Sequence, residues 1–76
     1  MSLVKEHEMV VLTADLPGER LAIGDVGTVV HVHKGGEAYE VEFLTLTGAT
    51  VAVVSVAASQ LRAVDHRDVS HARRVA

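Results

Sequence analysis

The sequence predicts an all-β domain, a small barrel or sandwich of five strands, on three observations. Its apolar share is 49% and is dominated by valine and alanine, and β-branched side chains fit the pleated surface of a sheet. Short apolar runs recur with glycine- or proline-bearing turns between them, which is the spacing of an all-β fold. Two such runs flank "KGGE", the pattern of an antiparallel hairpin. Seventy-six residues form a single domain, near the lower size limit for a self-sufficient core.

The expected elements follow one another in chain order. A long loop, residues 14–24, contains Pro17, Gly18 and Gly24, residues that end regular structure. The paired glycines of "KGGE" tolerate the positive φ of a tight reversal, and Gly48 marks the next reversal. Strands are expected at residues 8–13, 26–33, 38–44 or 45, 50–56 and 61–64, with one helical turn in "AASQ" before the last strand.

The hairpin around "KGGE" is specific enough to predict a register. If these residues are a four-residue loop, His33 faces Ala38, and one face of the hairpin is apolar while the other is mostly polar. The other facing pairs are then Val32–Tyr39, His31–Glu40, Val30–Val41, Val29–Glu42 and Thr28–Phe43.

The fourth strand carries no charge on either face, and a strand that is apolar on both faces is normally covered on both. One cover is the core, and the other is the C-terminal tail or a second molecule. Which face is which stays open, because no tight turn fixes the register of this strand. The whole run 43–61 is uncharged, but its threonines, serines and glycine favour two strands around a turn over a membrane span.

Composition argues against several functions. Ten acidic and seven basic residues give a net charge of −3, whereas a nucleic-acid-binding surface is usually basic. Tyr39 and Phe43 are the only aromatic residues of the chain, too few for a base-stacking platform. The absence of cysteine excludes disulfides and thiolate metal sites. Charges in "MSLVKEHE" stand where a signal peptide is apolar, so a cytoplasmic protein is expected.

Two kinds of chemistry have candidate residues. His31 and His33 share one strand face with Glu40 opposite, and two imidazoles with a carboxylate can bind zinc. The alternative is a solvated face with a His31–Glu40 cross-strand pair. Ser55 and Ser59 lie in no recognisable nucleophile context. We therefore predict no enzyme and no cofactor.

The predicted domain spans residues 1–64, and residues 65–76 form a C-terminal extension, either a frayed end or a short helix that caps the fold. Its three arginines are accompanied by Asp65 and Asp68. An arm for nucleic acid or for an acidic partner is a further alternative.

The segments "DLP" (15–17), "GDVGTVV" (24–30) and "AYEVEF" (38–43), followed by a threonine- and valine-rich strand and "ASQLRAV", resemble a family of short bacterial proteins known only as a domain of unknown function. The resemblance covers residues 8–64. It implies a small SH3-like five-stranded barrel, in which "AASQ" is the helical turn before the last strand, and no established activity.

"IGDVGTVVHV" is also similar to the KOW motif of ribosomal and transcription-elongation proteins, whose glycine corresponds to Gly27. KOW domains meet RNA or protein partners through neighbouring, often basic loops. Here Lys34 is offset by Glu37, and Arg20 by Asp15 and Glu19. Nucleic-acid binding of this kind is therefore an alternative function, and metal binding through His31 and His33 is another.

The leading hypothesis is a non-catalytic protein-interaction module. It is expected to bind another protein or itself along the fourth strand and the long loop. A small accessory role, as in an antitoxin or an immunity protein, fits the size of the chain. The candidate interaction residues are Leu16, Pro17, Arg20, Val51, Val53, Val54 and Val56.

Overall fold

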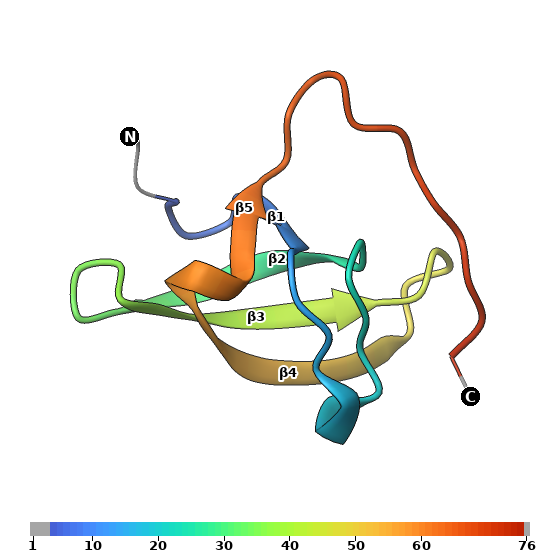
Figure 1. Cartoon of the computed structure of the whole chain (residues 1–76), viewed down its shortest axis with the longest axis horizontal. Helices are drawn as coiled ribbons and strands as arrows, with labels where there is room; N and C mark the ends of the chain where they lie inside the picture. Colours follow the sequence, from blue (N-terminus) through green and yellow to red (C-terminus); the bar gives the residue numbers. More distant parts are fainter. Residues whose placement is uncertain (1–3, 76) are drawn as a thin grey trace.

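A computed structural model describes residues 4–75. They form one antiparallel sheet of five strands and contain no α-helix (Figure 1). The strand order is β4-β3-β2-β1-β5, and the predicted all-β class and strand positions are confirmed. The elements are β1 (Met9–Leu12), the 3₁₀ helix η1 (Pro17–Glu19), β2 (Val26–His33), β3 (Ala38–Leu44), β4 (Thr50–Ala57), the 3₁₀ helix η2 (Ala58–Gln60) and β5 (Leu61–Ala63).

The sheet bends around a single core, although it is not closed. Strands β4 and β5 are its two edges, and no ladder joins them in the described residues. Both nevertheless contribute to the same cluster of buried side chains, which holds Val10, Leu12, Leu21, Val29, Tyr39, Val41, Phe43, Val54, Val56 and Leu61. Among the described residues, the only polar side-chain group in this core is the Tyr39 hydroxyl. Burial of apolar surface therefore drives the fold.

The predicted hairpin register holds only near the turn. His33–Ala38, Val32–Tyr39 and His31–Glu40 face each other as predicted. A β-bulge at Val30 then shifts the register by one residue, so that the observed pairs are Val29–Val41, Thr28–Glu42 and Gly27–Phe43. The three remaining predicted pairs are therefore wrong.

The bulge is explained by burial. It turns Val29 inward, where it is fully buried, and leaves Val30 39% exposed. An unbulged ladder would bury Val30 and expose Val29, and would place Thr28 in front of Phe43. The bulge adds one residue to β2. Gly27, which has no side chain, therefore faces the Phe43 ring in place of Thr28.

Gly27 is required at this place by packing. A Cβ atom here would lie 2.5 Å from Cγ1 of Val41 and 2.9 Å from a ring carbon of Phe43. Neither neighbour can retreat easily, because both side chains are buried in the core. The glycine that resembles the KOW glycine thus makes room for the Phe43 ring.

The uncharged run 43–61 comprises the end of β3, the whole of β4 and η2, and the start of β5. This agrees with the prediction of two strands around a turn. No helix within residues 4–75 has the length and apolar character needed to cross a membrane.

The C-terminal extension leaves β5 and runs outside the sheet as irregular chain (Figure 1). Its described part, residues 65–75, contains no helix, so the short helix that the sequence offered as one alternative does not form there. Side-chain contacts hold the segment in place of helical hydrogen bonds. We call residues 68–75 the C-terminal strap.

We predict that Gly27→Ala lowers the free energy of unfolding by about 1–3 kcal/mol, because the added methyl group overpacks the contact with Val41 and Phe43. Urea denaturation followed by circular dichroism measures the change. Gly18→Ala is the matched control, since a Cβ there meets no atom within 4 Å. Equal stability of the two variants would show that β2 and β3 do not approach each other as described.

Candidate functional site

The outer edge of β4 presents backbone groups that no other described strand pairs with. The Ala58 amide donates to the Glu37 carbonyl at 3.0 Å, and hydrogen bonding alternates along an antiparallel ladder. The backbones of Val54 and Val56 therefore face β3, and those of Val53, Ser55 and Ala57 face outward. The outward amide of Ala57 donates to Oε1 of Gln60 at 3.2 Å. The free part of the edge is thus centred on Val53 and Ser55.

The structure decides which face of β4 is core. Val54 and Val56 are buried, so their side chains do not lie at the surface where the sequence placed candidate interaction residues. Val53 points outward and is 51% exposed. Val51 occupies a second bulge, between Phe43–Ala52 and Leu44–Thr50, and packs partly against the core.

The candidate residues of the long loop are tied to other parts of the chain. Leu16 exchanges two backbone hydrogen bonds with Leu21, at 2.9 and 3.1 Å, and packs partly against the core. The 3₁₀ helix η1 begins at Pro17. Arg20, the residue after its end, has a left-handed backbone conformation with φ 59°. The Arg20 carbonyl accepts a hydrogen bond from Arg73 at 3.0 Å, so this loop supports the C-terminal strap.

The outer face of β2 and β3 carries the histidine pair. Nε2 of His33 lies 2.8 Å from Oε2 of Glu40, whereas His31 lies 3.9 Å from Glu6. The expected ion pair thus forms with the other histidine. The hydrogen bond with His33 lowers the pKa of Glu40. Among residues 4–75 no group of three or more histidine, aspartate or glutamate side chains is placed to hold a metal ion.

Ser55 belongs to the same polar cluster. Its hydroxyl donates to Oε2 of Glu40 at 3.2 Å, the oxygen that His33 contacts. The carboxylate therefore lies between hydroxyl and imidazole, and the imidazole cannot take the serine proton directly.

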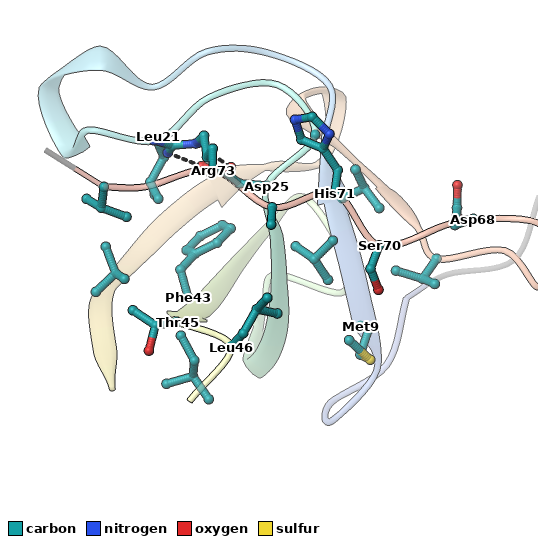
Figure 2. Close-up of a pocket in the computed structure, with 18 of the residues that line it drawn as sticks. Met9, Leu21, Asp25, Phe43, Thr45, Leu46, Asp68, Ser70, His71 and Arg73 are labelled. Carbon is teal, nitrogen blue, oxygen red and sulfur yellow. Dashed lines mark hydrogen bonds and ion pairs between the residues drawn. The ribbon is translucent and has the colours of Figure 1, made fainter. Parts of the chain in front are cut away.

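An apolar groove of about 980 Å³ lies between the sheet and the C-terminal strap (Figure 2). Figure 2 shows Met9, Phe43 and Leu46 around this space, with the contact between Arg73 and Asp25 beside it. Most of the exposed large apolar side chains in residues 4–75 line it, among them Met9, Val26, Leu44, Leu46, Val64 and Val69. Sequence reasoning missed this site, because its walls come from segments far apart in the chain.

A forked ion pair ties the strap to the body of the protein. The Arg73 guanidinium donates to both oxygens of Asp25, at 2.8 and 2.5 Å. Asp25 also accepts a hydrogen bond from the Ala22 amide at 2.9 Å. The bond from Arg73 holds the pKa of Asp25 below its ordinary value. Such planar, two-bond pairs are among the stronger polar contacts of proteins.

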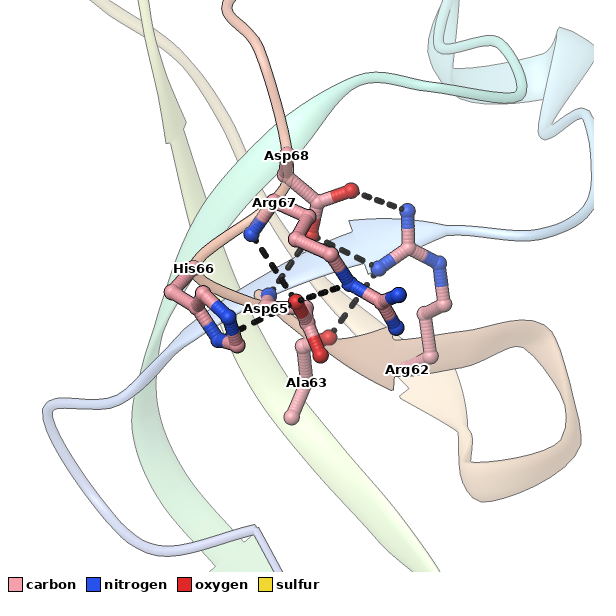
Figure 3. Close-up of polar contacts among 6 residues, drawn as sticks. All are labelled: Arg62, Ala63, Asp65, His66, Arg67 and Asp68. Atoms are coloured by element: carbon pink, nitrogen blue, oxygen red, sulfur yellow. Dashed lines mark hydrogen bonds and ion pairs between the residues drawn. The ribbon is translucent and has the colours of Figure 1, made fainter.

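A second ion pair holds the beginning of the strap (Figure 3). Both terminal nitrogens of Arg62 donate to the Asp68 carboxylate, at 2.9 and 2.8 Å. Asp68 also accepts a hydrogen bond from the Asp65 amide at 2.6 Å. The Arg62 bonds lower the pKa of Asp68. Arg67 lies beside Asp65, 3.4 Å away, so of the three arginines of the extension only Arg74 forms no ion pair with a described residue.

These observations define an all-β domain with an open strand edge and an apolar groove under a C-terminal strap. A family model described as a domain of unknown function, DUF4926, matches residues 6–63. The chain belongs to this family, and the family resemblance seen in the sequence is confirmed. Neither the comparison with curated proteins nor that with solved structures gave a match.

We predict that Asp25→Asn loosens the strap, because Arg73 loses its charged partner, and that it lowers the free energy of unfolding by about 1 kcal/mol. Backbone ¹⁵N relaxation measures the mobility, with falling heteronuclear NOE values expected for residues 70–75. Asp15→Asn is the control, since Asp15 accepts the Ile23 amide and does not contact the strap. An unchanged strap in Asp25→Asn would refute the ion pair as its anchor.

The ion pair also predicts a pH dependence. The pKa of Asp25 is lowered in the folded state from its ordinary value of 3.8. The stabilisation is therefore complete above that value and is lost as the pH falls through the lower, folded pKa. The stability difference between wild type and Asp25→Asn should be constant near neutral pH and shrink below about pH 4. Urea titrations at a series of pH values test this, and a difference that grows on acidification would contradict it.

Proposed function

We propose that the protein is a non-catalytic interaction module that binds an extended segment of another protein along the outer edge of β4. One observation carries the proposal. The eight-residue edge strand β4 has neither charge nor proline and, on its outer side, no partner strand in the described chain, and its bulge lies at Val51, outside the free part around Val53 and Ser55. Natural proteins normally protect such edges with lysine, proline, a bulge or a covering segment. A partner strand would satisfy the outward groups of Val53 and Ser55.

Two details support this mode of binding. The outward amide of Ala57 already donates to the Gln60 side chain. The free part of the edge therefore ends before Ala57 and is confined to the middle of the strand. Val53 adds an exposed apolar side chain next to these backbone groups. A role as a small accessory protein, antitoxin- or immunity-like, is part of the same proposal.

We further propose that the sheet is an SH3-like barrel. The strand order supports this, as do the 3₁₀ turn η2 before the last strand and the shared core under both edges. In this arrangement strand addition is proposed at β4, because this edge strand has eight residues whereas β5, the other edge strand, has three.

The test removes the outward-facing backbone amide of Val53. Val53→Pro removes the donor at the centre of the free edge and leaves the ladder to β3 intact, since proline is tolerated where the N–H faces away from the sheet. Tagged wild-type protein, isolated from its cells after nuclease treatment, is expected to elute with a second polypeptide chain in a fixed ratio. We predict that Val53→Pro loses this chain and that Val53→Ala, which keeps the amide, retains it.

Val53→Lys provides a second variant in case proline distorts β4, because an edge lysine blocks strand addition without changing the backbone. Circular dichroism confirms that each variant is folded. Retention of the partner by folded Val53→Pro and Val53→Lys would refute binding at this edge. If the wild type is recovered only in complex with itself, the partner at this edge is a second copy of the chain and not another protein.

A further inference from the structure

The C-terminal strap, a chain segment fixed at both ends, lines one side of the groove. Asp68 is held by Arg62, and Arg73 by Asp25. The five-residue step between these ties spans at most about 18 Å. An occupant that leaves both ion pairs in place therefore shares the groove with the strap. A thin linear molecule meets this condition with less displacement of the strap than a loop of a folded protein.

The walls of the groove favour an apolar chain. Met9, Val26, Leu44, Leu46 and Val64 turn exposed apolar side chains toward it. The volume of about 980 Å³ lies at the upper end of the roughly 300–1,000 Å³ usual for small-molecule sites. An exposed apolar surface of this kind gains free energy when a ligand removes it from water.

The charges around the groove favour an anionic head group. Its two carboxylates, Asp25 and Asp68, are each neutralised by an arginine. Arg74 also lines the groove, and no ion pair joins it to another described residue. The remaining charge at the strap is therefore positive.

We propose that this groove binds a linear apolar chain with a carboxylate head, such as a free fatty acid. The chain lies along the sheet between Val26 and Leu46, and the carboxylate lies near Arg74 at the strap. Val51 of β4 lines the groove, but Val53 and Ser55 do not, so the site is distinct from the free part of the β4 edge.

Calorimetric titration with dodecanoate, below its micelle concentration, tests the apolar part of the site. We expect one dodecanoate per chain. Val26 and Val30 form a matched pair, since both belong to β2 and both are 39% exposed, but only Val26 lines the groove. Val26→Glu should weaken binding by at least about tenfold, and Val30→Glu should leave it unchanged. Leu46→Glu, in the exposed turn after β3, repeats the test if Val26→Glu is unfolded.

Two further comparisons test the head group. Arg74→Ala should weaken dodecanoate binding several-fold, whereas Arg67→Ala, whose arginine lies outside the groove beside Asp65, should not. Dodecyltrimethylammonium, with the same chain and a cationic head, should not bind at this site. The proposal is overturned if dodecanoate does not bind, if the two valine variants bind it equally, or if the cationic amphiphile binds as well as dodecanoate.

Discussion

The close approach of β2 and β3 at Gly27 is the constraint on which the rest of the structure depends. Because no side chain stands on β2 there, the Phe43 ring can lie against the backbone in the core. The bulge at Val30 makes this alignment possible and brings Val29 inward at the same time. The register of β3 then sets that of β4, so that Val54 and Val56 complete the core. The outward groups of the β4 edge are thus a consequence of a packing contact two strands away.

A different kind of contact shapes the groove. Asp25, in the turn before β2, receives bonds from Ala22 in its own loop and from Arg73 near the C-terminus. One carboxylate therefore joins the long loop, the start of β2 and the C-terminal strap. Together with Arg62 and Asp68 it fixes the strap beside a group of exposed apolar side chains. The chain needs these polar ties because the strap itself buries little: Val69 is 88% exposed.

The polar outer face of the hairpin differs from the two proposed binding surfaces, the β4 edge and the groove. Glu40 is hydrogen-bonded to His33 and to Ser55, so its oxygen already has partners from the two neighbouring strands. This cluster links β2, β3 and β4 on the outer face of the sheet. Within residues 4–75, the outward backbone groups of the β4 edge and the apolar side chains of the groove have no such polar cluster around them.

The sequence by itself determined the class of the fold, the positions of the strands to within a residue and the turn of the hairpin, because periodicity and glycine placement are local signals. It also indicated the importance of β4 through its lack of charge. Only the tertiary structure decided the rest. Whether Val29 or Val30 is inward depends on the room that Gly27 leaves for Phe43, and which face of β4 is core depends on that register. The groove depends on an ion pair between residues 25 and 73, whose partners are brought together by folding and carry no mutual signal in the sequence.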